Sequence, residues 1–279
     1  MFGEAKPFLK WAGGKSQLLP QISPHLPRQF NTYGEPFMGS AALYFHLCYR
    51  QKRGETDWPL SRLSDMNAEL VNCYQVVRDR LQELVALLTL HRQHHSRDYY
   101  YSIRNWQPEE LDPVERAARL IYLNKTCYNG LYRVNRAGKF NVPIGRYRNP
   151  RIFDAAQLQA VSLALQNVVL EVAEFSHVLG WAKAGDLIYL DPPYVPRSPT
   201  ANFTGYTHQE FDMQAQVRLA KVYRQLDQRG CYVILSNSWS ETVLDLYRGF
   251  RCLELKATRM INSKADQRGY VSEVLVLNY

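Results

Sequence analysis

The sequence LIYLDPPY occupies residues 187–194 of a chain of 279 residues. Its first four residues form an apolar run of the length expected for a strand that is buried on both faces. A helical pattern follows at 213–227, and further runs with the composition of strands lie at 168–172, 232–235, 250–255 and 274–277. Because strands that alternate with helices assemble into a mostly parallel sheet, we predict an α/β fold whose last two strands form an antiparallel hairpin.

The four residues after this strand, Asp191-Pro192-Pro193-Tyr194, have the composition of a binding site. In open α/β sheets, ligands bind beyond the carboxyl ends of the strands. The two prolines keep the backbone extended and remove two N–H donors. The turn therefore presents the Asp191 carboxylate, the Pro192 carbonyl and the Tyr194 ring, which together suit a flat ring that carries an amino group. The alternative is a strand-ending turn in which Tyr194 packs in the core.

The N-terminal part of the chain contains a second turn and a second acidic strand end. Phe37-Met38-Gly39 predicts a tight turn before a helix rich in small residues, and the short strand 62–65 ends in Asp65. Apolar residues at spacings of three and four then predict one long helix from Leu70 to Leu88.

Residues 68–151 look like an insertion with a function of its own. The sequence DPVE at 112–115 predicts a helix start, because its Asp can cap the helix, its Pro suits the first turn and its Glu completes a capping box. Short extended pieces follow Leu131, and the turn residues at 136–138 predict a β-hairpin. We therefore expect a first domain formed by 1–67 and 152–279, and an inserted, mainly helical domain at 68–151.

The charge of the chain favours a polyanionic partner. Lys and Arg total 34 against 26 Asp and Glu, which gives a net charge of +8, and the pI is about 9.2. Between Arg116 and Phe153 there are nine basic residues and no acidic one, with aromatic residues interleaved. Basic side chains neutralise phosphates and aromatic rings stack on bases. An arginine-bearing hairpin can also read guanine in the major groove, so this segment predicts binding to nucleic acid.

Other classes of protein and site receive no support. The five cysteines are widely spaced without a C-x-x-C pair, which predicts reduced thiols. Because no run approaches the ~20 apolar residues of a membrane helix and no signal peptide is evident, we expect a soluble intracellular protein. Gly14-Lys15-Ser16 ends like a phosphate loop, but Leu9 occupies the position of the first glycine. His91, His94 and His95 lack a further ligand motif, so we expect no metal site and exposed side chains.

Three segments together resemble the Dam-type (D12 class) DNA adenine N6-methyltransferases. They are FLKWAGGK at 8–15, EPFMG at 35–39 and DPPY at 191–194, in the order of that family. The resemblance continues through YNGLYR at 128–133, GKFNVP at 138–143, GRY at 145–147, TANFTGY at 200–206 and LSN at 235–237. It covers nearly the whole chain and implies a Rossmann-like methyltransferase fold. It also implies S-adenosyl-L-methionine (AdoMet) as the cofactor, double-stranded DNA as the partner, and no metal.

The resemblance assigns cofactor contacts to several loops. The backbone amides of 12–14 and the Lys15 ammonium suit the carboxylate of AdoMet, Gly39 lets the backbone approach the cofactor, and Asp65 lies where an acid binds ribose hydroxyls. Asp65 could also cap the following helix. The family commonly has a glycine where this chain has Ala41, for which we expect altered loop geometry or affinity. The expected cofactor residues are Trp11, Ala12, Gly13, Gly14, Lys15, Phe37, Gly39, Asp65, Glu174, Phe175 and Asp191.

The resemblance also assigns a DNA surface. It places base readout on Leu131 and Arg133, and phosphates or flanking bases on Lys10, Asn129 and Arg146. The similarity of the hairpin to Dam-type proteins suggests the target GATC. The expected DNA-binding residues are Lys10, Tyr128, Asn129, Leu131, Arg133, Asn141, Pro143, Arg146 and Tyr147.

The expected reaction is methylation of adenine N6 by base flipping, with Asp191, Pro192 and Tyr194 as the catalytic residues. Two alternatives stay open: a cytosine N4-methyltransferase, in which Ser more often precedes Pro-Pro-Tyr, and a catalytically inactive DNA-binding regulator of the same fold. We expect a cytoplasmic monomer, encoded by a bacterium or phage and associated with the nucleoid through DNA.

Overall fold

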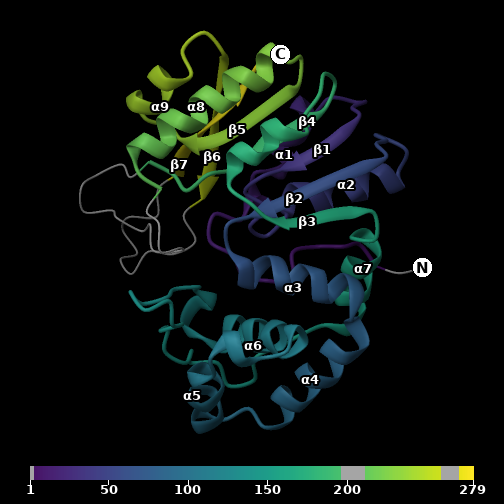
Figure 1. Cartoon of the computed structure of the whole chain (residues 1–279), viewed down its shortest axis with the longest axis vertical. Coiled ribbons are helices and arrows are strands. Elements are labelled where there is room, and N and C mark those ends of the chain that lie inside the picture. The colour runs from purple at the N-terminus through teal and green to yellow at the C-terminus, as the bar shows by residue number, and fades with distance from the viewer. Residues whose placement is uncertain (1–2, 196–210, 259–269) are drawn as a thin grey trace.

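The computed structural model describes residues 3–195, 211–258 and 270–279, and its strands form one seven-stranded sheet (Figure 1). The order across the sheet is β3-β2-β1-β4-β5-β7-β6. β1 to β5 run parallel, whereas β7 lies antiparallel between β5 and β6. The predicted sheet with its antiparallel C-terminal hairpin is therefore confirmed. The strands are β1 Thr32–Glu35, β2 Leu60–Asp65, β3 Val168–Val172, β4 Leu187–Leu190, β5 Tyr232–Ser238, β6 Arg251–Thr258 and β7 Tyr270–Leu277.

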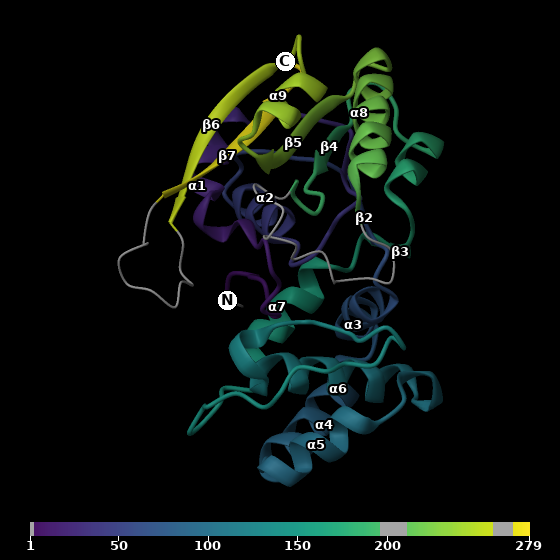
Figure 2. The ribbon, with the colours of Figure 1, turned by 90° about the vertical axis from the view of Figure 1, so that its left-hand side faces the viewer.

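Both faces of β4 are buried, as its apolar run predicts. Leu187 and Tyr189 belong to one hydrophobic core, whereas Ile188 and Leu190 belong to the other, because successive side chains of a strand point to opposite faces. Figure 2 shows α8 on the opposite side of the sheet from α1 and α2. The helices against the sheet are α1 Leu19–Ile22, α2 Ala42–Lys52, α8 Met213–Gln228 and α9 Glu241–Leu246.

A second layer of helices lies beyond β3, which is an edge strand (Figure 1). α3 connects the two layers, since it packs against both β3 and α6. None of the helices in the described ranges is long and apolar enough to span a bilayer. The helices of this layer are α3 Ala68–Asp79, α4 Leu81–Gln93, α5 Arg97–Asn105, α6 Pro113–Thr126 and α7 Ala155–Ala164.

The single helix predicted from Leu70 to Leu88 is wrong, because the chain breaks between α3 and α4. Arg80 has φ −131° and ψ 38°, outside the helical region. Its guanidinium group donates to Glu83 at 2.6 Å and to Asp112, at the start of α6, at 3.1 Å. Of these contacts, only the one with Asp112 joins Arg80 to a distant part of the chain, and no glycine or proline marks the break in the sequence.

Two local predictions in this layer are confirmed. The capping box of α6 is complete, because the Asp112 carboxylate accepts from the Val114 N–H and the Glu115 carboxylate accepts from the Asp112 N–H. The predicted hairpin is present in a short form, with one antiparallel bridge between Val134 and Phe140.

Asn124 of α6 ties the N-terminal segment to the helical layer. Its side chain is 1% exposed. Its Oδ1 accepts from the Lys10 N–H at 2.8 Å, and its Nδ2 donates to the carbonyls of Lys10 and Gly130 at 2.7 and 3.0 Å. Gly130 has φ +65°, and the Lys10 side chain occupies the space that a Cβ there would need. Lys10 and Gly130 are therefore fixed side by side.

Asn124→Asp tests this connection. The substitution keeps the acceptor for Lys10 N–H but removes both donors and buries a charge, so we expect a loss of about 2 kcal/mol or more in the free energy of unfolding. Asn129→Asp, at an exposed position, serves as the control and should change it by less than about 0.5 kcal/mol. Denaturant unfolding followed by circular dichroism measures both, and equal effects would contradict this account of Asn124.

Candidate active site

The candidate site lies where the sheet changes its direction of growth. From β1 the chain adds β2 and β3 on one side, and β4 then pairs with the other side of β1. The loops after two neighbouring parallel strands diverge at such a point and leave a crevice for a ligand. Phe37 and Gly39 follow β1, Asp191 follows β4, and Asp65 ends β2. Three sequence-predicted segments are therefore brought together at the carboxyl edge of the sheet.

Asp191 lies in a charged corner. The Lys15 side chain is 4% exposed, and its ammonium group lies 2.8 Å from Asp191 Oδ1. Burial raises the pKa of Asp191 to about 6, although the charge of Lys15 lowers it. The carboxyl group is therefore mostly ionised at neutral pH. Apart from this ion pair, Oδ1 has no hydrogen-bond partner in the part of the chain that the structure describes.

Tyr194 forms one wall of this corner. The Lys15 ammonium lies 4.8 Å from the centroid of its ring, and its hydroxyl donates to Glu273 Oε2 on β7 at 2.5 Å. Tyr194 as a residue is half-buried. The alternative in which it packs in the core is therefore wrong.

The N-terminal loop contacts the turn after β1. Lys15 donates to the Gly13 carbonyl at 2.6 Å, and Gly14 N–H donates to the Trp11 carbonyl at 3.2 Å. Gly39 has φ +44°, and a Cβ built there would lie only 3.1 Å from Trp11 Cδ1. A glycine is required here both for its backbone conformation and for the close approach of Trp11. Ala12 is exposed between these contacts.

Asp65 fixes the turn after β1 from the end of β2. Its two oxygens accept from the N–H groups of Gly39 and Asn67 at 3.1 and 2.9 Å. Burial raises the pKa of Asp65, although these backbone bonds lower it. The cap of α3 is the Asn67 side chain, which accepts from Leu70 N–H, so the alternative role of Asp65 as the cap is wrong.

Ala41, where the family commonly has a glycine, adopts a backbone conformation that glycine accepts more easily than alanine. It has φ 51° and ψ 35°, the left-handed conformation, directly before α2. An alanine there costs about 1–2 kcal/mol more than an ordinary conformation. The loop thus keeps a glycine-like backbone at the expense of strain.

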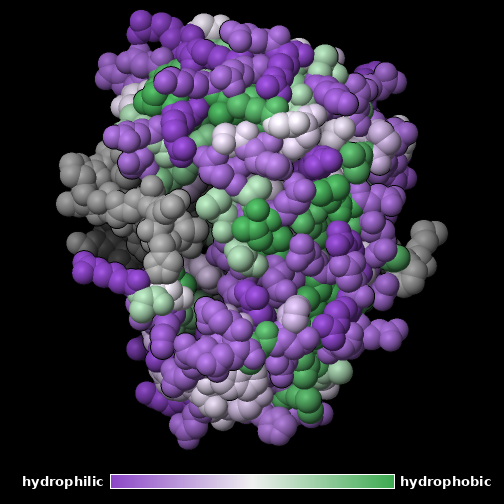
Figure 3. Space-filling view, viewed as in Figure 1, coloured by the Kyte–Doolittle hydropathy of each residue, from purple (hydrophilic) through white to green (hydrophobic). Residues whose placement is uncertain are grey.

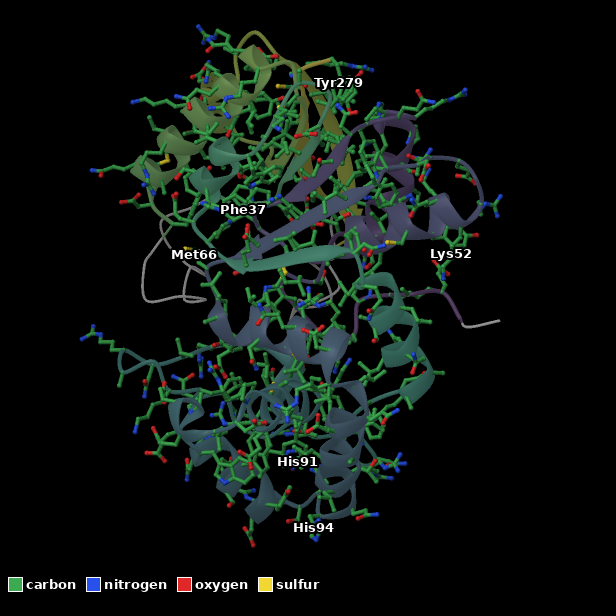
Figure 4. The ribbon with its side chains drawn as sticks, turned by 45° about the vertical axis from the view of Figure 1, so that its right-hand side comes forward. Phe37, Lys52, Met66, His91, His94 and Tyr279 are labelled. Atoms are coloured by element: carbon green, nitrogen blue, oxygen red, sulfur yellow. The ribbon has the colours of Figure 1, made fainter. Side chains whose placement is uncertain are left out.

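An apolar wall borders the turn after β1. The rings of Phe37 and Phe175 stack with centroids 5.5 Å apart, and Glu174 caps the short helix Phe175–Gly180 by accepting from Ser176 N–H. Met66, which follows β2, is 46% exposed. Figure 4 shows Phe37 and Met66 at the same end of the sheet. Sequence reasoning did not single out Met66, because its exposure is not visible in the sequence.

Not all basic residues of the segment 116–153 are exposed, although its composition predicts a continuous basic surface. Arg116 pairs with Glu69, and Arg119 is buried, where it donates to the carbonyls of Ile103 and Arg104. These two arginines stabilise the helical layer and are not available to a ligand. The exposed basic residues of the segment belong to the hairpin and its flanks: Arg133, Arg136, Lys139, Arg146, Arg148 and Arg151. The hairpin projects at the left of Figure 1, and hydrophilic side chains cover the same projection in Figure 3.

The predicted DNA-binding residues lie on and beside this hairpin. Arg133 Nε donates to Asn141 Oδ1 at 2.7 Å, which extends the guanidinium group along the hairpin. The Lys10 ammonium donates to the Tyr147 hydroxyl at 3.2 Å. The exposed residues among the others are Tyr128, Asn129, Pro143 and Arg146, whereas Leu131 is half-buried.

His91 and His94 lie at the bottom of the helical layer in Figure 4, away from Phe37 and Met66. The expectation that all three histidines are exposed is wrong for His91, which is 4% exposed and bonds to the Tyr99 hydroxyl at 2.8 Å. It is also wrong for His95, which is half-buried and bonds to the Tyr122 hydroxyl at 2.8 Å. Burial lowers the pKa of His91 to about 4, so it is neutral. Within the described residues, no group of three or more His, Cys, Asp and Glu side chains could hold a metal ion.

Sequence reasoning also left several polar residues behind the corner without a role. Glu35, at the end of β1, is buried and accepts from the Tyr33 hydroxyl at 2.9 Å, and burial raises its pKa well above the usual range. Glu273, Gln216 and Asn237 contact the turn 193–195. Glu35 and Asn237 belonged to quoted motifs, whereas Gln216 and Glu273 did not. The motif residues 200–206 lie outside the described residues.

Comparisons with known proteins agree with this geometry. Residues 11–261 match the model of the D12 class N6 adenine-specific DNA methyltransferase family. The Type II methyltransferase M.MjaIII of Methanocaldococcus jannaschii is 42% identical, with 99% of this chain and 100% of that protein covered. The Type II methyltransferase M1.LlaDCHI of Lactococcus lactis is 40% identical, with 98% and 95% covered. The DNA adenine methylase of Escherichia coli is 34% identical, with 97% and 94% covered. The resemblance found in the motifs is confirmed: the chain belongs to the D12 class of N6 adenine-specific DNA methyltransferases and has their Rossmann-like fold.

Proposed function

We propose that this enzyme transfers a methyl group from AdoMet to N6 of an adenine that is flipped out of duplex DNA at GATC. The observation that carries the proposal is Asp191: a carboxylate held 2.8 Å from the ammonium group of a buried lysine, at the point where β4 pairs with β1 and the sheet changes its direction of growth. An ion pair on the surface would be hydrated on all sides. A buried carboxylate is less hydrated, so it can accept hydrogen bonds from the N–H groups of an amine substrate without competition from water.

The residues around the crevice fit AdoMet. Lys15 and the loop 11–14 would hold its carboxylate, Gly39 gives close backbone access, and Asp65 would accept from its ribose hydroxyls through lone pairs that its two backbone bonds leave free. Phe37, Phe175 and Met66, with Glu174 beside them, offer an apolar surface for its adenine ring. When bound, AdoMet supplies an electrophilic methyl group on a positively charged sulfur.

The corner would prepare the target nitrogen for attack. The lone pair of an adenine amino group is delocalised into the ring, so the nitrogen is a poor nucleophile. The Asp191 carboxylate and the Pro192 carbonyl would accept its two N–H bonds and favour a tetrahedral nitrogen. Tyr194 would stack on the flipped ring, and the negative charge of Asp191 would stabilise the positive charge that develops on N6. Holding both reactants in place accounts for much of the rate.

The segment 68–151 is proposed as the target-recognition domain. The exposed hairpin would enter the major groove, where Arg133 and Leu131 read bases. Lys10, Asn129 and Arg146 would contact phosphates or flanking bases, and Tyr128, Asn141, Pro143 and Tyr147 would complete the surface. The target GATC rests on the similarity of this segment to Dam-type enzymes. We propose a monomer as the active form.

Asp191→Asn tests the catalytic role. The variant keeps the shape of the side chain but loses its charge, so we expect single-turnover methylation to fall by about 10³-fold or more. DNA affinity, measured by fluorescence anisotropy of a labelled duplex, should change by less than about threefold. Methylation at the wild-type rate would contradict the role of Asp191.

Lys15→Met tests the electrostatics of the corner through pH. Ionised Asp191 is the active form, so the wild-type rate should fall as the pH drops through about 6. Removing the Lys15 ammonium removes the charge that lowers this pKa, so the acid limb should move to higher pH. Single-turnover rates at saturating AdoMet measure this shift. Lys6→Met, at an exposed ion pair, is the control, and an unmoved limb in Lys15→Met would refute the coupling.

Arg133→Ala tests base readout. Loss of a bidentate contact with guanine should cost about 1–3 kcal/mol at one base pair of the target. Sequencing of the products from a random-sequence duplex library should show GATC for the wild type and a relaxed preference at one position for the variant. Arg148→Ala, also exposed, should weaken binding without changing the preferred sequence. A wild-type product other than GATC would overturn the proposed target.

A further inference from the structure

Two buried amide side chains form a continuous chain of hydrogen bonds behind the catalytic corner. Gln216 of α8 is 1% exposed and Asn237 of β5 is 0% exposed. Gln216 Nε2 donates to the Pro193 carbonyl at 2.8 Å, and Asn237 Nδ2 donates to Gln216 Oε1 at 3.1 Å. Asn237 Oδ1 accepts from the N–H groups of Val195 and Ser238 at 3.3 and 2.8 Å.

The direction of this chain follows from its two ends. At one end, two backbone N–H groups can only donate, so the oxygen of Asn237 must face them. Its NH₂ group then faces Gln216, whose oxygen must accept. The NH₂ group of Gln216 is thereby left for the Pro193 carbonyl, which can only accept. Neither amide can flip without leaving two buried groups unpaired, which is costly.

The chain fixes the backbone on both sides of Tyr194. Gln216 holds the carbonyl before it, and Asn237 holds the N–H after it. Ser238 Oγ donates to the Val195 carbonyl at 3.1 Å, and Glu273 accepts from the Tyr194 hydroxyl. The tyrosine is thus held at both ends of its backbone and at the tip of its ring.

The same chain of hydrogen bonds reaches the Pro193 carbonyl but not the Pro192 carbonyl before it. The Pro193 carbonyl is occupied by Gln216, whereas no residue in the described ranges donates to the Pro192 carbonyl. The two prolines restrict the backbone dihedrals between these carbonyls. Fixing the Pro193 carbonyl toward α8 therefore limits the directions in which the Pro192 carbonyl can point.

We infer that Gln216 and Asn237 are positioning residues for methyl transfer, which set the orientation of the Pro192 carbonyl and the Tyr194 ring toward the target adenine. This inference rests on the proposed role of Asp191-Pro192-Pro193-Tyr194. The two amides touch neither substrate, so their removal should lower the rate of transfer more than it weakens binding. Displacement of a reacting group by about 1 Å can cost about 100-fold in rate.

Gln216→Glu gives a test that a merely structural role would not pass. The ionised carboxylate cannot donate to the Pro193 carbonyl, whereas the protonated acid has the donor and acceptor pattern of the amide. Burial raises the pKa of the introduced group. We expect its single-turnover rate to be about 10–100-fold below wild type at pH 8.5. As the pH is lowered to 6, the ratio of variant to wild-type rates should rise toward one.

Matched variants keep the test decisive. Gln214→Glu makes the same change at an exposed position of α8, two residues before Gln216. The rate of this variant should equal that of the wild type at every pH. Asn237→Asp keeps the acceptor for Val195 and Ser238 but loses the donor to Gln216, so it should show the same loss and the same recovery. The dissociation constants for AdoMet and duplex, measured by calorimetry and anisotropy, should change by less than about threefold.

Three outcomes would overturn the inference. They are a Gln216→Glu rate within twofold of wild type at pH 8.5, a deficit that does not change with pH, and a rise in both dissociation constants in step with the lost rate. Full activity of Asp191→Asn in the same assay would overturn the proposed function as well. With Asp191→Asn inactive, failure of the Gln216 and Asn237 variants to respond counts against this inference alone.

Discussion

An ionised carboxylate that is largely buried is the constraint on which the site depends. Burial alone would favour the protonated form of Asp191, and the Lys15 ammonium at 2.8 Å opposes it. The balance leaves the group charged at neutral pH but poorly solvated, so it gains more than an exposed carboxylate from an amine that replaces water. Lys15 comes from the N-terminal loop and Asp191 from the end of β4. The ion pair therefore forms only when the fold brings these two distant segments to the same edge of the sheet.

Rigidity is the second requirement, and the chain supplies it by several local means. Two prolines restrict the turn, the Gln216–Asn237 chain holds its backbone, and Ala41 accepts a left-handed conformation that alanine disfavours. Asp65 fixes the neighbouring turn through Gly39 N–H. Each device limits the motion of groups that would contact a reactant, and preorganised groups stabilise a transition state without reorganising during the reaction.

The sequence predicts the features that depend on local chemistry, and it fails where tertiary contacts decide. The strand before Asp191 and the capping box at Asp112 follow from apolar runs and cap residues, and both are present. At the break, Arg80 contacts Asp112, which lies 32 residues further along the chain, and no glycine or proline marks the break in the sequence. Composition counted Arg119 among the nucleic-acid contacts of the basic segment, but its partners are carbonyls of α5. The motifs predicted the position of the corner. Gln216 of α8 and Glu273 of β7, which lie behind it, belong to no such motif, and the sequences of these two elements predict only that they pack in the core.

The proposed recognition and cofactor surfaces meet at Lys10 and Trp11. Asn124 binds Lys10 and Gly130 together and so joins the N-terminal loop to the proposed recognition segment. The next residue, Trp11, packs on Tyr132 with centroids 5.1 Å apart and also against Gly39. If the proposed recognition segment shifted on a wrong target, it would displace Trp11 or break buried hydrogen bonds. Because Trp11 borders the proposed cofactor loop, a mismatch in the DNA would then lower the rate of transfer as well as the affinity. Discrimination at the transition state adds to discrimination in binding.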